Sequence, residues 1–136
     1  MKKTIFAIIM AAIVGLFAVS CSKSQMNSSK LIGTWKITSV VEASASGTYS
    51  PNLDNETYTI QFAKDGTFVF SGASSKGSGS AKGTWTVVED TIAIVVDNGY
   101  FDIVSGTWTI TTLNAKSLVI TQVDDGESIT ISMSKL

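Results

Sequence analysis

The chain has 136 residues, a formal net charge of −1 and one cysteine, and its length predicts a single domain. It contains no His, which removes the commonest general base and metal ligand, so the composition argues against an enzyme and predicts no metal or other cofactor. Residues 21–136 carry eight Lys, no Arg and eleven Asp or Glu, and such a chain lacks the clustered cations that nucleic-acid binding needs.

The first twenty residues have the pattern of a secretory signal, because two lysines precede an apolar run that ends in small residues. The next residue is Cys21, and Ala18-Val19-Ser20-Cys21 resembles a lipobox, where signal peptidase II cleaves before a diacylglycerol-modified cysteine. The sequence therefore predicts lipid attachment at Cys21 and an exported protein anchored in the cell envelope, with Ser22 favouring the outer membrane. The alternative is an ordinary signal peptidase I site that leaves Cys21 as a free thiol.

Three segments follow from this pattern. Residues 1–20 are predicted to be the lipoprotein signal peptide, and residues 21–29 a flexible polar tether. Residues 30–136 are predicted to form one all-β domain, because apolar and polar residues alternate with a period of two almost throughout.

The alternation predicts eight strands joined by short connections, with turns at sites such as Asp65-Gly66, Asn98-Gly99 and Asp124-Asp125-Gly126. In the first strand Trp35, Ile37 and Val41 share the inward face. The predicted strands are Leu31–Val41, Glu56–Ala63, Thr67–Ser71, Gly83–Val88, Thr91–Val96, Tyr100–Thr112, Ser117–Val123 and Glu127–Ser134.

The sixth predicted strand changes phase along its length. Phe101 and Ile103 share one parity, whereas Trp108 and Ile110 share the other. A β-bulge near Ser105-Gly106 would reconcile the two halves.

Eight such strands form either a sandwich or a closed antiparallel up-and-down β-barrel, and sequential hairpins favour the barrel. The two longest connections, 42–55 and 72–82, then lie at the same end, which we expect to be the mouth. We expect 72–82 to be mobile and 42–55 to act as a lid, with Tyr49 and Leu53 as its large apolar residues.

Gly33-Thr34-Trp35 fits the G-x-W signature of lipocalin and calycin barrels. The chain resembles the lipocalin-like domain of small bacterial lipoproteins of the Bacteroidota in several motifs. These are Leu31–Ile37, Phe62–Phe68, Gly83–Val87, Trp108–Ile110 and Leu118–Thr121. The resemblance implies a barrel with an apolar interior that binds a small hydrophobic molecule. Typical lipocalins pack an Arg near the last strand over the signature Trp; here Lys135 is the only nearby cation.

Inward aromatic residues, with a few polar neighbours, are the candidate ligand-binding set: Trp85, Tyr58, Phe68, Phe70 and Gln122. We expect Trp85 at the mouth, because it follows the start of its predicted strand at Gly83, and Trp35 and Trp108 at the barrel base. Trp85→Ala should then affect ligand binding more than stability, and Trp35→Ala the reverse. The alternative for each aromatic residue is that it simply fills the barrel.

Two functions remain open at this stage. The first is an envelope lipoprotein, monomeric and not an enzyme, that binds a small hydrophobic ligand inside its barrel. The second is a module that binds an envelope protein or a protease through its loops, with a fully packed barrel and no small-molecule ligand.

Overall fold

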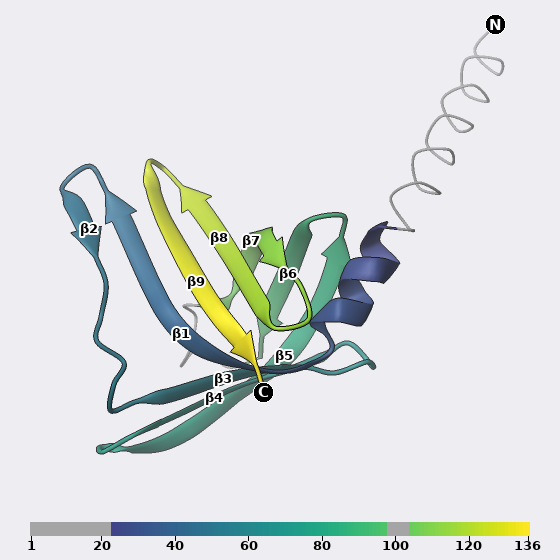
Figure 1. Ribbon diagram of the computed structural model, residues 1–136, viewed down its shortest axis with the longest axis horizontal. Helices are drawn as coiled ribbons and strands as arrows, with labels where there is room; N and C mark the ends of the chain where they lie inside the picture. The colour runs from purple at the N-terminus through teal and green to yellow at the C-terminus, as the bar shows by residue number, and fades with distance from the viewer. Residues whose placement is uncertain (1–22, 98–103) are drawn as a thin grey trace, which may run out of the picture.

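The structure is a computed structural model, and it describes residues 23–97 and 104–136. Its strands form one antiparallel sheet that closes on itself (Figure 1). The strands are β1 (Gly33–Ser44), β2 (Gly47–Tyr49), β3 (Thr57–Phe62), β4 (Thr67–Ser74), β5 (Gly77–Val88), β6 (Thr91–Val96), β7 (Gly106–Leu113), β8 (Ser117–Asp124) and β9 (Glu127–Lys135). The predicted eight-stranded up-and-down barrel is confirmed, and β2 is a short addition that pairs with β1 outside the closed ring.

Strand β1 closes the barrel because both of its edges are paired. One edge pairs with β9, from Trp35 opposite Lys135 to Ala43 opposite Ser128. The other edge pairs with β3 only over the first four residues of β1, and β2 takes over at Glu42. Residues 37–41 of β1 therefore have no strand partner on that edge.

The connections define two ends of the barrel. The turns after β1, β4 and β8 lie at one end, which we call the mouth, and the turns after β3, β5 and β7 lie at the other, the closed end. The predicted turn after β8 is present: Asp125 and Gly126 have φ values of 46° and 79° between the paired residues Asp124 and Glu127. Positive φ at both central residues is what a type I′ hairpin requires.

The long loops predicted at the mouth need correction, because most of 72–82 and the first part of 42–55 are strand. Strand β1 continues to Ser44, β4 continues to Ser74, and β5 begins at Gly77. In each hairpin a serine hydroxyl accepts a hydrogen bond from the amide two residues later, Ser44 from Ser46 and Ser74 from Lys76. This local bond favours a tight turn, and the backbone ladder then extends through Ser, Gly and Ala that pack little.

The phase of the strands also differs from the prediction at two places. A bulge between Ile37 and Ser39 shifts β1, so Val40 and not Val41 packs against the core. In β7 the register shift lies between Ile110 and Thr112. Residues 98–103, which include the predicted turn at Asn98-Gly99 and the residues Phe101 and Ile103, lie outside the described residues.

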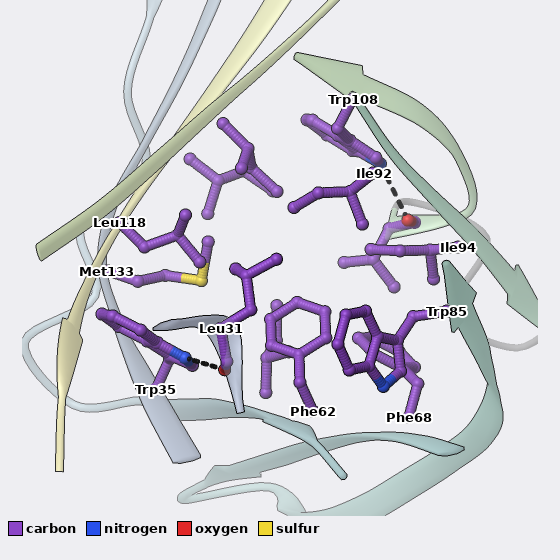
Figure 2. Packing of buried hydrophobic residues seen from close by; sticks show 14 of the residues in the cluster. Leu31, Trp35, Phe62, Phe68, Trp85, Ile92, Ile94, Trp108, Leu118 and Met133 are labelled. Atoms are coloured by element: carbon purple, nitrogen blue, oxygen red, sulfur yellow. Dashed lines mark hydrogen bonds between the residues drawn. The ribbon is translucent and has the colours of Figure 1, made fainter. Parts of the chain in front are cut away.

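Large apolar side chains fill the closed half of the barrel (Figure 2). The alternating inward positions of every barrel strand contribute to this cluster, as the period-two pattern predicts. Its largest fully buried members are Trp35, Trp108, Phe62, Phe68, Leu31 and Ile60.

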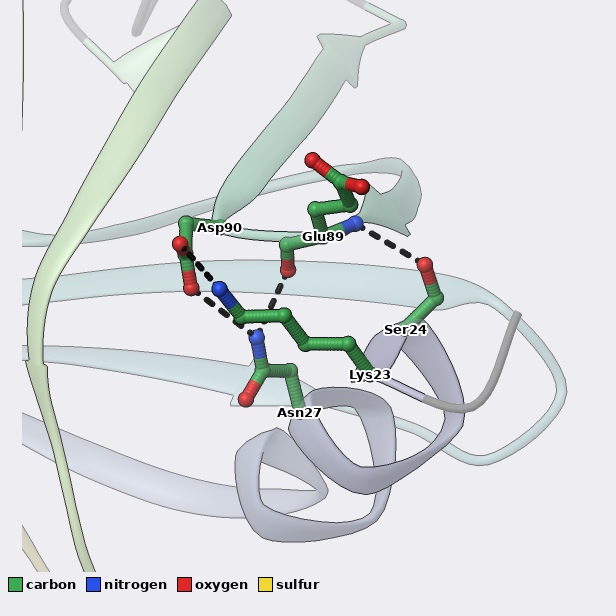
Figure 3. Close-up of polar contacts among 5 residues, drawn as sticks. All are labelled: Lys23, Ser24, Asn27, Glu89 and Asp90. Carbon is green, nitrogen blue, oxygen red and sulfur yellow. Dashed lines mark hydrogen bonds and ion pairs between the residues drawn. The ribbon is translucent and has the colours of Figure 1, made fainter. Parts of the chain in front are cut away.

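Residues 23–31 form a helix that lies against the turn between β5 and β6 (Figures 1 and 3). The Lys23 ammonium pairs with the Asp90 carboxylate at 2.7 Å. The Ser24 hydroxyl accepts from the Glu89 amide, and the Asn27 amide donates to the Glu89 carbonyl. The described part of the predicted flexible tether, 21–29, is therefore helical and docked. No described helix is long and apolar enough to span a bilayer.

The last residue of this helix closes the barrel base. Leu31 is fully buried among Trp35, Phe62 and Met133 (Figure 2). The Trp35 indole N–H donates to the Leu31 carbonyl at 2.8 Å, which satisfies a carbonyl that the helix end leaves free. Lys135 lies over the Trp35 ring, 5.1 Å from its centroid, where a typical lipocalin would place the Arg.

Candidate functional site

A cavity of about 270 Å³ lies between the packed core and the mouth. Its floor is apolar and buried, and its rim is partly buried and includes two carboxylates. This volume is close to the lower limit of about 300 Å³ for small-molecule sites. The floor residues are Ile37, Phe70, Val104 and Ile131, and the rim residues are Val40, Glu42, Pro51, Leu53, Glu56 and Tyr58.

The cavity exists because β1 and β3 separate. Residues 37–41 of β1 lack a partner on the β3 side, and the segment between β2 and β3 fills only part of that space. The Ser50 hydroxyl donates to the Val40 carbonyl at 3.0 Å and ties this segment to β1. Leu53 packs on the core from the same segment and forms one wall of the cavity.

Two stacked aromatic rings, Phe70 of the floor and Tyr58 of the rim, form a wall of the cavity on β3 and β4. The Tyr58 ring lies on the Phe70 ring with centroids 5.9 Å apart and planes 22° from parallel. Gly72, which pairs with Tyr58 across β3 and β4, leaves room for this ring, since a Cβ there would lie 2.8 Å from Tyr58 Cε1. The glycine therefore fixes the position of the wall.

The polar end of this wall is a tyrosine–carboxylate pair. The Tyr58 hydroxyl donates to Glu56 Oε2 at 2.6 Å. This hydrogen bond raises the pKa of Tyr58 above its ordinary value of 10.0, and partial burial and the negative charge of Glu56 act in the same direction. Any stability from the pair is thus present below pH 10 and is lost as the pH rises through the raised pKa of Tyr58.

We expect Glu56→Gln to lower the pKa of Tyr58 towards its ordinary value, because the substitution removes the charged acceptor. The measurement is the ultraviolet absorbance of phenolate during an alkaline titration. Subtracting the titration of Tyr58→Phe isolates this one tyrosine. An unchanged pKa in Glu56→Gln would contradict the pairing.

Of the residues predicted to bind ligand, Tyr58 and Phe70 line the cavity, as does Leu53 of the predicted lid. Phe68 does not line it, because it is fully buried next to Phe62 in the closed half. Gln122 does not line it either, because its side chain lies at the start of β7, where its amide donates to the Thr107 carbonyl at 3.4 Å.

Tyr49, the other predicted lid residue, is 62% exposed on β2. It lines a separate hollow of about 380 Å³ beside the β1–β2 hairpin. Most of its lining residues are Ser, Thr and Glu, among them Glu42, which lines both hollows, so it suits an apolar molecule less well.

The predicted position of Trp85 at the mouth needs correction. Its indole N–H donates to the Ala63 carbonyl at 3.0 Å, its amide donates to the Gly66 carbonyl, and both acceptors belong to the turn at the closed end. The error arose because β5 begins six residues before Gly83, so Trp85 is far along the strand. Trp35 lies beside the helix at the closed end, and Trp108 is buried with its indole N–H on the Val104 carbonyl.

Sequence reasoning missed Glu42, Glu56 and Val40 as site residues, together with Ile37, Pro51, Val104 and Ile131. The sequence pattern places Glu42 at the start of a loop and Glu56 at the start of a strand, whereas Glu42 is inside β1 and Glu56 directly precedes β3. The available signal was the spacing of Glu56 and Tyr58, because residues two apart at the start of a strand lie on the same face of the sheet. Among the described residues, no group of metal-ligating side chains comes together.

The sequence matches the profile of the lipocalin-like domain over residues 31–134. The chain belongs to this lipocalin-like family. No curated protein matches it in sequence.

Two crystal structures are similar to this lipocalin-like domain. A lipocalin-like protein from Bacteroides uniformis is 19% identical with a TM-score of 0.59, and the match covers 79% of this chain and 99% of that one. An uncharacterized protein from Bacteroides eggerthii is 15% identical with a TM-score of 0.56, and the match covers 78% and 99%. At these identities the similarity shows the fold alone. The lipocalin-like family is typically one of binding and not of catalysis.

Proposed function

We propose that this lipocalin-like domain binds a small hydrophobic molecule in the cavity between its core and its mouth, and that it is not an enzyme. The observation that carries the proposal is the buried apolar floor formed by Ile37, Phe70, Val104 and Ile131. A floor of this kind gains free energy when an apolar surface replaces water, at roughly 25 cal/mol per Å². The same cavity favours a ligand carrier over a module whose barrel is completely packed.

The closed half supports the proposal in a second way. Leu31, Trp35 and Lys135 close the base, so the described residues leave the cavity no opening through the closed end. A pocket that is dry below and open above holds an apolar body with its polar end towards solvent.

We further propose that the protein is anchored to the cell envelope, in the outer membrane, through lipid at Cys21. The helix that starts at Lys23 is held at the closed end by Asp90, Glu89 and Leu31 (Figure 3). An anchor so close to Lys23 would keep the closed end near the bilayer and turn the mouth away from it. Mass spectrometry of the mature N-terminus tests this, since an unmodified Cys21 would contradict it.

The binding proposal predicts a specific effect of filling the cavity. The probe is N-phenyl-1-naphthylamine, a neutral apolar dye whose fluorescence rises in a dry site. We expect the protein to bind it, and Val40→Phe to weaken binding by about tenfold or more, since even one methylene in an apolar pocket has an effect of that size. Val40 lies on the rim and its side chain faces the cavity.

The matched control is Val123→Phe, because Val123 is 71% exposed and does not line the cavity. Its effect on dye affinity should stay within about twofold. An equal loss of dye affinity in Val40→Phe and Val123→Phe, or no dye binding by the folded wild-type protein, would overturn the proposed function.

A further inference from the structure

The cavity carries negative charge. Among the described residues that line it, the charged ones are Glu42 and Glu56, and no lysine is among them. Both carboxylates belong to partly buried residues, so solvent screens them less than it screens surface charges. An anionic head group in the same space would meet two like charges.

The two carboxylates differ in their partners. Glu56 already accepts the Tyr58 hydroxyl. Within the described part of the chain, the Glu42 carboxylate has no hydrogen-bond or ion-pair partner. Its full accepting capacity is therefore available to a donor that enters the cavity.

The surroundings of the mouth have the same sign. The described turns there and their flanking residues carry Asp54, Asp124, Asp125 and Glu127, against the single lysine Lys76. A cleft lined by charge of one sign concentrates counter-ions at its entrance and speeds their association. This field attracts cations and repels anions before they reach the cavity.

We propose that the ligand is a small apolar molecule that bears a positively charged amino group, with its body on the apolar floor and the ammonium on the Glu42 carboxylate. The inference rests on the proposed function and narrows its ligand class, because it excludes fatty acids. Hydrogen bonds between an ammonium and a carboxylate are roughly twice as strong as neutral ones. Glu56, next to Tyr58, supplies the second negative charge at the same rim.

The test uses three probes that share one apolar body: octylamine, octanol and octanoate. Each competes with N-phenyl-1-naphthylamine on the full mature protein at pH 7. We expect octylamine to displace the dye at a concentration about tenfold or more below that of octanoate, with octanol between them. Added salt should reduce the difference between the two charged probes.

Glu42→Gln keeps the size of the side chain and removes its charge. We expect this variant to bring octylamine close to octanol, as measured by the ratio of their displacing concentrations on the same variant. The matched control Glu127→Gln removes an exposed charge at the same end but outside the cavity, and it should change the octylamine preference much less. If Glu42→Gln does not fold, the wild-type protein decides whether the ligand is an amine, through the order of affinity for the three probes and the salt dependence of that order.

The outcomes separate this inference from the proposed function. If Val40→Phe weakens dye binding but octanoate competes as well as octylamine or better, the ligand is not an amine. The proposed apolar site would still stand. An octylamine preference that survives in folded Glu42→Gln would overturn the role of Glu42. Failure of the wild-type protein to bind the dye would overturn the proposed function itself.

Discussion

Trp85→Ala is expected to lower the free energy of unfolding by about 3–5 kcal/mol, as truncation of a buried Trp usually does. Trp85 is 6% exposed, its ring packs edge-on against Phe62 with centroids 5.2 Å apart, and its indole N–H donates to Ala63. The substitution would leave a cavity at the closed end and free the Ala63 carbonyl. Denaturant unfolding followed by circular dichroism measures the loss.

The same variant should keep its affinity for N-phenyl-1-naphthylamine within about twofold, because Trp85 does not line the mouth cavity. Trp35→Ala is the matched comparison, and we expect it to behave alike, since Trp35 is fully buried at the same end. A folded Trp85→Ala protein that loses dye binding while keeping its stability would instead place the site at the closed end.

Gly83→Ala is the second substitution with a large expected effect, a loss of about 1–3 kcal/mol or more in unfolding free energy. Gly83 lies inward on β5, and a Cβ there would overlap the Val95 carbonyl oxygen of β6. The obstacle is backbone within a paired strand, so it cannot move aside as a flexible side chain would.

Thermal and denaturant unfolding would measure this cost, with Thr86→Ala on the exposed face of the same strand as the control. The control should change stability by no more than about 0.5 kcal/mol. An equal unfolding free energy for Gly83→Ala and wild type would show that the Val95 carbonyl does not lie against Gly83 as described.

The barrel could be predicted because its information is local. Alternation in runs such as Thr91–Val96 and Ser117–Asp124 fixes which face is buried, and Asp-Gly pairs mark the turns. Sequential short turns then leave few topologies. The two mouth hairpins were missed because Ser, Gly and Ala carry no hydrophobic signal, although the backbone ladder needs none.

The helix at residues 23–31 could not be predicted for a related reason. Its segment has only two large apolar residues, Met26 and Leu31, and its stability comes from tertiary contacts with Asp90 and the core. A contact between residues more than sixty positions apart leaves no trace in a local pattern.

The candidate site could be predicted only in part, because some of its residues follow from a local pattern and others depend on tertiary structure. Tyr58 and Phe70 follow from strand parity, whereas Val40 depends on a bulge that shifts β1 by one residue. Trp85 was misplaced because strand direction locates a residue only when the strand start is known. Glu42 and Glu56 line the cavity because β1 and β3 separate. That separation is a property of the closed barrel, so no local pattern predicts it.

The central claim is that the apolar cavity at the mouth is the binding site. The most direct measurement is a methyl and aromatic NMR titration of the protein with N-phenyl-1-naphthylamine. We expect intermolecular contacts and shift changes at Ile37, Val40, Leu53, Phe70 and Ile131, with the Trp85 indole unaffected. Contacts confined to the outer face of the barrel, or to the hollow beside Tyr49, would contradict the claim.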